Sequence, residues 1–479
     1  MSRLLVVSNR LPAGRPVGTS GELEVTAGGL VPALLGALAD RPGSVWIGWD
    51  SRAPAGAAPT RARSGGVELV GVSLGRAEVE GYYDGFCNQA LWPLLHCFLQ
   101  RVVFERAHVE AYLRVQERFA DVVAKLASPG DAVWIHDYHL VGLGAALRRR
   151  GVAARIGFFL HTPFPPEDVW SVLPGARRLL ADLSACDLVA FHTRRYLDNY
   201  VRACERELGA RWNGEHLIQE GGSQRVAVHP VGIEPDELGQ AAGRPGREGP
   251  GGLARFARGR KVILGVDRLD YTKGLVERFR AFELLLAEHP EWHDRVTFVQ
   301  IASPTRGNLA SYAAQRRELE ELVGRINGRF GRVDWVPIRY LYRSFPRSTL
   351  ARYYRAADVA LVTPLRDGMN LVAKEYVACQ DPEDPGALVL SRFAGAAERM
   401  ADALLVNPYF PAEVAGTLHA ALELPLEERR RRHARLLAEV RENTSNRWAD
   451  GFLADLGASA RDGEELRQRR NRERPVTVE

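Results

Sequence analysis

Short apolar runs alternate with longer helix-forming stretches along nearly the whole chain of 479 residues. This alternation predicts parallel β-sheets covered by helices on both faces. The chain is too long for one ordinary hydrophobic core, so two domains are expected. The predicted strands form two sets, which are Arg3–Ser8, Val45–Gly48, Ala132–His136, Arg155–His161, Leu188–His192 and Arg225–Val231, then Lys261–Val266, Val296–Ala302, Asp334–Pro337, Val359–Thr363, Leu388–Ser391 and Ala403–Val406.

The two strand sets predict an α/β fold of two doubly wound, Rossmann-like domains that face each other across a cleft. Between the sets lies Gly239–Gly252, which is rich in Gly, Pro and Arg and predicts a mobile connection. We place the first domain at residues 1–238 and the second at 253–445. Residues 446–479 should form a helix that returns to the first domain, with a disordered tail from about Arg461. The predicted helices include Val109–Leu126, Gly274–His289, Ser311–Phe330 and Leu424–Asn443.

The composition is that of a soluble enzyme, with 46% hydrophobic and 26% charged residues. The chain has 64 basic and 59 acidic residues, and this net charge of +5 fits anionic small substrates as well as nucleic acid. The arginine-rich stretches at 427–435 and 467–474 are interpreted as a solvated helix face and a loose tail. With no membrane-length apolar run, no cleavable signal and five cysteines without zinc spacing, we expect a cytoplasmic protein with reduced thiols.

The segment Val266–Gly274, VDRLDYTKG, leaves a predicted strand and opens a helix. Arg268 and Lys273 place two cations on this turn, next to the partly positive end of the helix. Such a turn can neutralise a diphosphate that leaves when a sugar–phosphate bond breaks. The alternative is a structural one, in which Asp270 caps the helix and Lys273 is solvated.

The segment Thr363–Tyr376, TPLRDGMNLVAKEY, has the same strand–turn–helix pattern. Its turn exposes backbone N–H groups at a helix N-terminus, which suits an anion. Asp367 could accept hydrogen bonds from sugar hydroxyls, and Glu375 could bind the vicinal hydroxyls of a ribose. The alternative is a simple Asp-Gly turn followed by a surface glutamate. Farther upstream, Arg306 follows another strand and offers a forked donor for phosphate.

The first half of the chain offers weaker signals. Arg10 and Asp137 lie at predicted strand ends, Gly28 and Gly29 allow a ligand to approach the backbone, and His161 precedes several stiff prolines. His161 could equally be a buried, hydrogen-bonded core residue. Aromatic residues that could stack on sugar rings are Trp46, Trp49, Tyr82, Tyr83 and Trp92.

Some motif matches mislead. Gly71–Gly75 fits the GxSxG pattern of serine hydrolases, but Glu80–Gly85 is predicted to be turn-like and not the required helix. His136 and His139 have a spacing that suits a metal pair, yet no third ligand is evident. The sequence contains no P-loop, no HExxH and no DxD motif, which argues against a metal-dependent sugar transferase.

Taken together, the segments are far more specific than any one of them. SNR, AGGL, GYYDGF, LWP, WIHDYHL, GFFLHTPFP, RLDYTKG, TRG, GRINGRFG, TPLRDGMNLVAKEY and SRFAGAA occur in that order. Over about residues 1 to 455 the chain resembles the trehalose-6-phosphate synthases. That resemblance implies two Rossmann-like domains of the GT-B type, no metal and no other cofactor. It also implies retaining transfer of glucose from UDP- or GDP-glucose to glucose 6-phosphate, without a covalent enzyme intermediate.

The resemblance also assigns roles to residues. It implies catalytic roles for Arg268, Lys273, His161 and Asp367, with Arg268 and Lys273 on the donor diphosphate and the other two on the transferred glucose. The donor site would further contain Gly28, Gly29, Gly368, Met369, Asn370, Leu371, Val372 and Glu375. The acceptor site would contain Arg10, Trp49, Tyr83, Trp92, Asp137 and Arg306, although Trp46 could replace Trp49. The expected partners are the two substrates and further copies of the chain, with no nucleic acid and no membrane.

Three other functions remain open at this stage. A related pseudo-glycosyltransferase would join cyclitol phosphates, and a glycogen-type synthase would extend a glucan. Both are disfavoured by the intact set of acceptor residues, because a glucan acceptor needs no phosphate clamp. A catalytically silent sugar-phosphate sensor would be expected to lose donor residues, yet Arg268, Lys273, Asp367 and Glu375 are all present.

Overall fold

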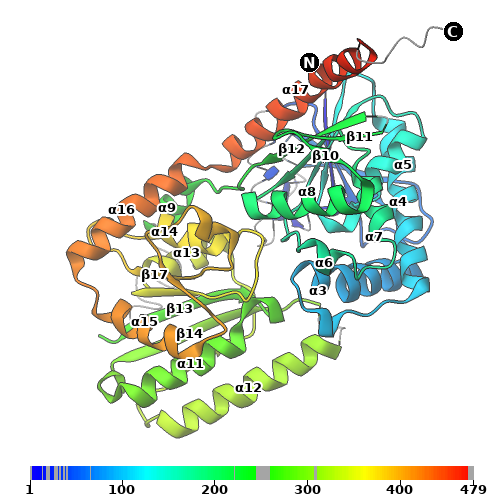
Figure 1. Ribbon diagram of the computed structural model, residues 1–479. Coiled ribbons are helices and arrows are strands. Elements are labelled where there is room, and N and C mark those ends of the chain that lie inside the picture. The colour runs from blue at the N-terminus through cyan, green and yellow to red at the C-terminus, as the bar shows by residue number, and fades with distance from the viewer. Residues whose placement is uncertain are drawn as a thin grey trace, which may run out of the picture. The chain divides into compact units, whose positions relative to one another are not determined.

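The computed structural model describes residues 3–12, 14–17, 22–25, 31, 34–35, 38, 41–64, 66–220, 222–243, 259–306 and 310–472. The chain divides into two compact units (Figure 1). Unit 1 comprises Met1–Thr26, Leu34–Pro230 and Asn446–Glu479, and unit 2 comprises Ala27–Ala33 and Val231–Ser445.

Unit 1 is built on a ten-stranded sheet in the order β10-β11-β12-β9-β8-β7-β1-β4-β6-β5. The central strands from β12 to β6 are parallel, and antiparallel strands extend both edges. The bounds are β1 Leu4–Arg10, β4 Val45–Trp49, β5 Thr60–Ser64, β6 Val67–Val72, β7 Ala132–His136, β8 Arg155–Phe159, β9 Leu188–Phe191, β10 Arg211–Trp212, β11 His216–Gln219 and β12 Gly222–Val228, with β2 Gly14–Val17 and β3 Glu22–Val25 as a separate hairpin.

Helices surround the sheet of unit 1. They are α2 Arg76–Glu78, η1 Val79–Leu91, α3 Trp92–Leu95, η2 Leu99–Arg101, α4 Arg106–Leu126, η3 Tyr138–Leu140, α5 Leu143–Arg149, α6 Glu167–Trp170, α7 Ala176–Leu183, α8 Arg194–Leu208 and α17 Ser445–Arg472. The prediction of a turn at Glu80–Gly85 is wrong, because these residues lie in the π-helix η1. The two glycines that suggested a turn instead allow close packing: a Cβ at Gly81 would lie 2.7 Å from Ala111, and one at Gly85 2.5 Å from His108.

Unit 2 is built on a six-stranded, fully parallel sheet in the order β15-β14-β13-β16-β17-β18. Numbered by chain order within the sheet, this is 3-2-1-4-5-6, the order of the doubly wound dinucleotide-binding fold. The same order recurs at the centre of unit 1 as β6-β4-β1-β7-β8-β9. The strands are β13 Lys261–Arg268, β14 Val296–Ser303, β15 Ile338–Leu341, β16 Val359–Val362, β17 Ala387–Ser391 and β18 Leu404–Val406.

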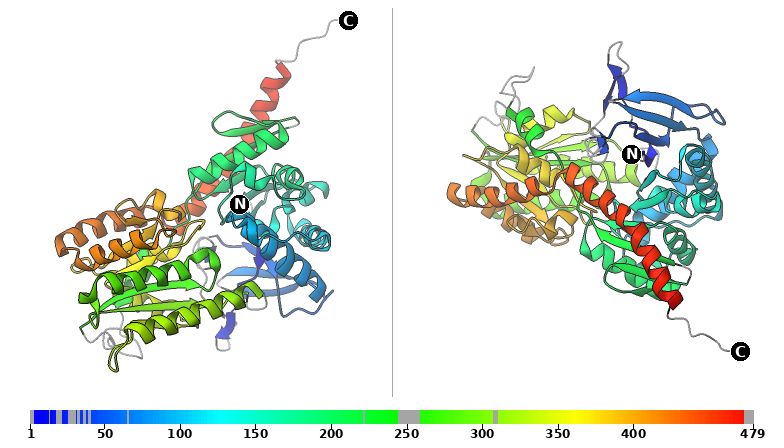
Figure 2. Two further views of the ribbon diagram at one scale, coloured as in Figure 1. Left: turned by 60° about the horizontal axis from the view of Figure 1, so that its bottom comes forward. Right: turned by 90° about the horizontal axis from the view of Figure 1, so that it is seen from above.

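The helices of unit 2 fall into two packed groups, which cover the sheet as Figure 2 shows. One group is α11 Leu275–Glu288, α12 Ala310–Phe330 and α15 Pro411–Glu423, and the other is α9 Pro235–Gly243, α13 Arg347–Arg355, α14 Leu371–Cys379 and α16 Leu426–Glu442. Short helices are η4 Tyr271–Lys273, η5 Pro290–Trp292 and η6 Gly395–Glu398. Because α9 packs on α13 and α14, unit 2 begins before the predicted boundary at 238, and residues 244–252 of the predicted connection lie outside the described residues.

The chain enters and leaves unit 2 at neighbouring points. A Cβ at Gly232 would lie 1.9 Å from the carbonyl oxygen of Asn443, so only glycine permits this approach. Beside it, the hydroxyl of Ser445 donates to a carboxylate oxygen of Glu234. The entering and leaving segments of unit 2 are therefore in direct contact.

The C-terminal helix α17 belongs to unit 1. Trp448 and Phe452 pack against Trp134 on β7, with ring centroids 4.8 and 4.6 Å apart, and His229 bonds Asp455. The helix continues to Arg472, so the prediction of a disordered tail from about Arg461 is wrong for residues 461–472.

Most predicted strands are present within one to three residues of their predicted ends, with one clear exception. Asp334–Pro337 is not a strand, and β15 begins at Ile338. Trp335 instead lies in the loop before it, buried, with its indole N–H donating to the carbonyl oxygen of Val296 at 2.8 Å. In the sequence, a buried tryptophan in a loop looks the same as a buried strand residue, which explains the wrong strand prediction.

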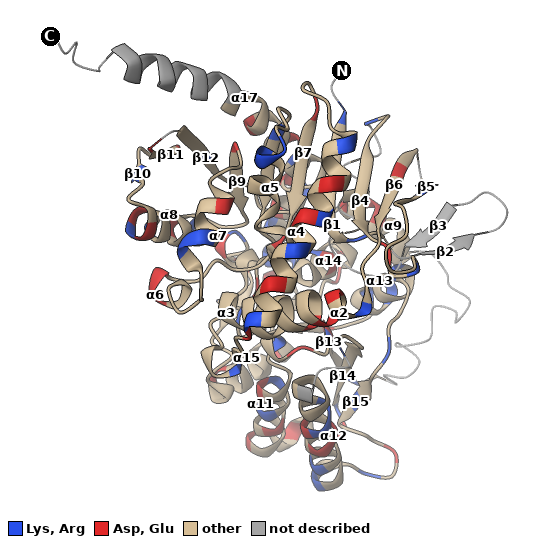
Figure 3. Cartoon of the chain, turned by 90° about the vertical axis from the view of Figure 1, so that its right-hand side faces the viewer, with Lys and Arg blue, Asp and Glu red and all other residues tan. Residues whose placement is uncertain are grey.

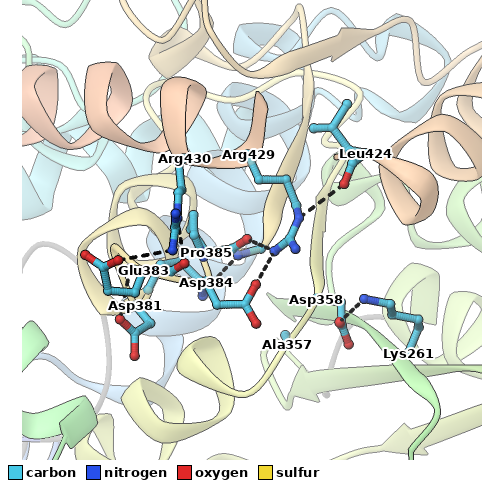
Figure 4. A network of polar contacts seen from close by, with 12 residues as sticks. Lys261, Ala357, Asp358, Asp381, Glu383, Asp384, Pro385, Leu424, Arg429 and Arg430 are labelled. Carbon is cyan, nitrogen blue, oxygen red and sulfur yellow. Dashed lines mark hydrogen bonds and ion pairs between the residues drawn. The ribbon is translucent and has the colours of Figure 1, made fainter. Parts of the chain in front are cut away.

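The arginines of α16 were predicted to form a solvated helix face. Several of them instead make hydrogen bonds and ion pairs within unit 2. Arg429 is 19% exposed, and it donates to Asp384 at 2.7 Å and to the carbonyl oxygens of Leu424 and Pro385 (Figure 4). Arg430 bonds the carbonyl and carboxylate of Glu383. Elsewhere, cations and anions alternate along α4 and α12, as Figure 3 shows. No helix among the described residues is long and apolar enough to cross a membrane.

Candidate active site

The strand order of unit 2 reverses direction between β13 and β16, and ligands of doubly wound sheets bind at this switch point, beyond the carboxyl ends of the strands. Lys273 follows β13, and Asp367 follows β16. The ammonium Nζ of Lys273 lies 2.5 Å from the carboxylate Oδ2 of Asp367, and both side chains are mostly buried. Two of the four predicted catalytic residues thus meet at the place where this fold binds ligands.

The turn that carries Lys273 is fixed by its own sequence. Asp270 caps the short helix η4, because its Oδ1 accepts hydrogen bonds from the backbone N–H and the hydroxyl of Thr272 at 3.0 and 2.9 Å. Gly274 has a φ of +65°, and a Cβ there would lie 2.4 Å from the carbonyl oxygen of Thr363. The N–H of Leu365 donates to the carbonyl of Thr272 at 2.8 Å, so the turns after β13 and β16 are bonded directly.

A buried arginine lies beneath both turns. The guanidinium of Arg278 donates to Asp267 Oδ2 at 2.6 Å, to Gln300 at 2.8 Å and to the hydroxyl of Thr363 at 3.0 Å. It also donates to the backbone carbonyl of Lys273 at 3.3 Å. Burial raises the pKa of Asp267 despite the charge of Arg278. Arg278 was not predicted, because an arginine inside a helical stretch resembles a surface residue in the sequence.

Arg306 lies in a second charged cluster of unit 2. Its side chain is 4% exposed, and its Nη1 donates to Asp270 Oδ2 at 3.2 Å and bonds the hydroxyl of Tyr312 at 2.6 Å. Burial alone would raise the pKa of Asp270, but the charges of Arg306, Arg268 and Lys273 bring it down to about 2. Asp270 is therefore a capping residue and, at the same time, the anion that neutralises these cations.

The turn after β16 presents its polar groups on a strained backbone. Asn370 has a φ of +75°, its amide donates to Asp367 Oδ2 at 3.0 Å, and its Oδ1 accepts the N–H of Ala373 to cap α14. Farther along α14, burial raises the pKa of Glu375, which accepts the hydroxyl of Tyr354 at 3.2 Å. Four predicted donor residues surround the cap, namely Gly368 and Met369 before it and Leu371 and Val372 after it.

The predicted acceptor residues of unit 1 meet at the corresponding switch point, between β1 and β7. Arg10 ends β1 and pairs in register with Trp49 at the end of β4. Its guanidinium lies 4.6 Å from the ring centroid of Trp49 and 4.5 Å from that of Tyr83. Tyr83 in turn stacks on His139, which was not predicted as an acceptor residue.

Trp46 cannot replace Trp49. It is fully buried, and its indole N–H donates to the hydroxyl of Ser8 at 2.8 Å. Trp92 is also buried, at 5% exposed, and it packs on Tyr138 and His96. Trp92 therefore supports the aromatic cluster from behind.

Asp137 follows β7 with a φ of +73°, one of five described non-glycine residues at positive φ. Its N–H donates to the carbonyl of Phe159, and its Oδ1 accepts the backbone N–H of His161 at 3.2 Å. Backbone strain of this kind collects at functional sites. The two hydrogen bonds of Asp137 connect the segment that follows β7 with the end of β8 and the residues just after it. They bring the two predicted residues Asp137 and His161 together.

The imidazoles of His136 and His161 form a hydrogen bond between Nδ1 and Nε2 of 3.0 Å. His136 bonds to His161, whereas His139 stacks on Tyr83. The two histidines, whose sequence spacing suits a metal pair, therefore have different partners. Gly28 and Gly29 lie outside the described residues. Ser73 of the GxSxG match donates to the carbonyl of Pro54 and is buried.

One group of possible metal ligands among the described residues, His289, Glu291 and His419, lies at the amino-terminal side of the unit 2 sheet. The two imidazole rings stack with centroids 3.8 Å apart and planes inclined by 13°, so their in-plane lone pairs lie in two separate, nearly parallel planes. Trp292 also donates to Nδ1 of His419. The geometry suits a stacked pair better than a metal site.

Comparison with known proteins identifies the family of the chain. Residues 2–458 match the family model of glycosyltransferase family 20. The chain belongs to glycosyltransferase family 20.

A trehalose-6-phosphate synthase of Cronobacter sakazakii is 44% identical over 461 residues, which is 95% of each chain. A crystal structure of a UDP-forming α,α-trehalose-phosphate synthase from Burkholderia vietnamiensis is 45% identical, with a TM-score of 0.91 over 96% of this chain and 98% of that one. A UDP-forming enzyme from Burkholderia xenovorans, solved in complex with glucose-6-phosphate, is 41% identical with a TM-score of 0.88 over 95% and 100%. This family member therefore has the two-domain GT-B fold of hexosyltransferases.

Proposed function

We propose that this chain is a UDP-forming trehalose-6-phosphate synthase. It transfers glucose from UDP-glucose to the anomeric hydroxyl of glucose 6-phosphate, with retention, and releases α,α-trehalose 6-phosphate and UDP. The observation that carries the proposal is the pair of Lys273 and Asp367 at the switch point of unit 2, since it combines a phosphate-binding cation with a sugar-binding carboxylate. The names of relatives that span the whole chain support the choice of substrates.

The residues of unit 2 act on the donor. Lys273 and Arg268 neutralise the diphosphate as the bond between the sugar C1 and the phosphate oxygen breaks. Asp367 accepts hydrogen bonds from glucose hydroxyls, and Glu375 binds the ribose. The turn from Gly368 to Val372 offers backbone N–H groups at the start of α14 to the phosphates.

The residues of unit 1 act on the two sugars. Arg10 binds the 6-phosphate of the acceptor, and Trp49, Tyr83, Trp92 and Asp137 position its ring or support the residues that do. His161 contacts the transferred glucose. We also assign Arg306 of unit 2 to the acceptor phosphate, and an unchanged KM for glucose 6-phosphate in Arg306→Ala would remove it from that site.

The chemical step needs no enzyme nucleophile. The acceptor hydroxyl attacks C1 on the face that the phosphate leaves, its proton passes to the departing phosphate oxygen, and the sugar is oxocarbenium-like between the two. The protein contributes position and charge, which together supply most of the rate enhancement of such reactions.

One assay tests the function. Purified protein is incubated with glucose 6-phosphate and UDP-, GDP- or ADP-glucose, and nucleotide release and the disaccharide phosphate are followed by NMR. We expect a non-reducing product with both anomeric protons in the α configuration, formed fastest from UDP-glucose. Nucleotide release without a disaccharide phosphate would disprove the proposal.

The same assay separates the alternatives. A silent sensor would bind glucose 6-phosphate without turnover, and a pseudo-glycosyltransferase would require a cyclitol phosphate. The complete donor set of Arg268, Lys273, Asp367 and Glu375 disfavours the sensor, because a non-catalytic protein would be expected to lose such residues. We further propose a cytoplasmic location, in keeping with five cysteines that form no disulfide, and assembly as a homo-oligomer, which light scattering of the purified chain tests.

A further inference from the structure

His161 has a single ring nitrogen left with which to meet a ligand. Its Nε2 lies 3.0 Å from Nδ1 of His136, and the two ring planes are inclined by 26° with centroids 5.2 Å apart. A neutral imidazole has one N–H donor and one acceptor nitrogen, so the two rings share one hydrogen in this bond. The tautomer of His136 therefore decides whether the remaining nitrogen of His161, Nδ1, is a donor or an acceptor.

Both imidazoles are neutral at pH 7. Burial lowers the pKa of His136 well below its usual value, and the neighbouring His161 lowers it further. Burial also lowers the pKa of His161, with His192 adding to the effect. A charged ring with two N–H donors is thereby excluded on either side of the bond, and only two tautomeric arrangements remain.

The surroundings of His136 distinguish the two arrangements. Its Nε2 is buried without a hydrogen-bond partner in the described part of the chain, and so are the indole N–H groups of Trp134 and Trp448. These indole rings lie 4.5 and 6.1 Å from the His136 ring. A hydrogen on Nε2 would make a third unsatisfied buried donor here, whereas a bare Nε2 is an acceptor among donors. The hydrogen of His136 therefore belongs on Nδ1, from where it is donated to His161.

We propose that His136 is a positioning residue that holds His161 as its Nδ1–H tautomer, so that His161 presents a hydrogen-bond donor to a hydroxyl oxygen of the transferred sugar. The part played by the sugar rests on the proposed function, but the tautomer does not. The backbone N–H of His161 also donates to Asp137, so one hydrogen bond holds its backbone and another holds its ring.

The tautomer is measured directly on the wild-type protein. Protein labelled with ¹⁵N-histidine is studied by long-range ¹H–¹⁵N NMR, and the His161 signals are assigned by their loss in His161→Asn. In the absence of substrate, we expect Nδ1 of His161 to be protonated and its Nε2 to be unprotonated. A protonated Nε2 would overturn the proposal, whatever reaction the protein catalyses.

Two substitutions of His136 test its effect on the reaction. His136→Asn places an amide N–H near the position of Nδ1 and should keep kcat within about three-fold. His136→Phe keeps a flat ring but removes the bond, and it should lower kcat with UDP-glucose about ten-fold while the KM for glucose 6-phosphate stays the same. His216→Phe, at a buried histidine on β11, is the matched control and should leave kcat unchanged.

The outcomes separate the two proposals. Equal loss of kcat in His136→Asn and His136→Phe, or no loss in either, would overturn the positioning role. A parallel rise in the KM for glucose 6-phosphate would also overturn it, because general damage to unit 1 would then explain the loss. Absence of any trehalose 6-phosphate with the wild-type protein would instead refute the proposed function and leave the NMR result intact.

Discussion

The two units share one strand order but carry different chemistry at its switch point. In unit 2 the groups at the carboxyl ends of the strands are charges that neutralise one another, as in Lys273–Asp367 and Arg306–Asp270. In unit 1 they are the aromatic rings of Trp49 and Tyr83 around the guanidinium of Arg10, and the neutral imidazoles of His136 and His161. The same fold thus carries paired charges at one switch point and mainly aromatic and neutral side chains at the other.

The difference has an energetic consequence. Buried charges are tolerated only when each has partners. The charged side chains at the switch point of unit 2 are therefore held by a network that extends to Arg278 and Asp267. Arg10 remains exposed at the end of its strand, and an exposed cation–π contact is worth about 0.5–1 kcal/mol. We therefore expect substitutions in unit 2 to affect stability and kcat, and substitutions of Arg10 to affect mainly the KM of one substrate.

The largest effect is expected from Arg278→Met, which leaves Asp267 buried without its cation. We expect the free energy of unfolding to fall by about 3–5 kcal/mol, measured by urea denaturation. The double variant Asp267→Asn, Arg278→Met should recover a large part of this loss. If the single variant is as stable as wild type, the network does not support the donor site.

Lys273→Ala should lower kcat by roughly 100- to 1000-fold, because one preorganised donor to the developing charge is lost. The KM for glucose 6-phosphate should change little. Lys261→Ala is the matched control, since Lys261 begins β13, the strand that Lys273 follows, and pairs with Asp358, as Figure 4 shows. Equal activities of the two variants would contradict the role of Lys273.

Asp270 links the network to pH. Its pKa is about 2 in the folded chain against an ordinary value of 3.8, so its contribution to stability is complete above pH 3.8 and is lost as the pH falls toward 2. The contribution is about 2 kcal/mol by linkage. Unfolding of wild type and Asp270→Asn should be compared between pH 5 and 2. Their difference in stability should shrink across this window, and a constant difference would contradict the lowered pKa.

Arg10→Ala should raise the KM for glucose 6-phosphate about ten-fold and leave the KM for UDP-glucose within a factor of two. The control is Arg106→Ala, because Arg106 of unit 1 is 93% exposed and pairs only along its own helix, with Glu110. Steady-state kinetics with each substrate varied in turn gives both constants. A larger effect on UDP-glucose would reverse the assignment of the two units.

Periodic apolar runs predicted nearly all central strands, because a strand buried on both faces is a continuous hydrophobic segment. Edge elements such as β5 and β10 were missed, since their exposed residues carry no such pattern. The helix η1 was missed because Gly81 and Gly85 resemble turn residues in a sequence, while in the structure they allow close packing.

The candidate site was predictable to a similar degree. Residues in the turns after strands, such as Lys273, Asp367 and Asp137, could be placed because parallel strands end at one edge of a sheet. Arg278 and Tyr312 could not, because nothing in their local sequence distinguishes a buried partner of a charge from a residue on a solvated helix. Pairing of His136 with His161 depends on the register of β7 and β8, which the sequence alone does not specify.

The contact of Gly232 with Asn443 has a practical consequence for the architecture of the chain. Because the chain enters unit 2 near Gly232 and leaves it near Asn443, and these two points touch, residues 231–445 begin and end at one place. An inserted domain has the same arrangement. We expect a chain whose ends lie side by side in this way to tolerate rejoining as a circular permutant without a long linker. Replacement of Gly232 by any larger residue would push the segments at Gly232 and Asn443 apart and weaken the contact between them.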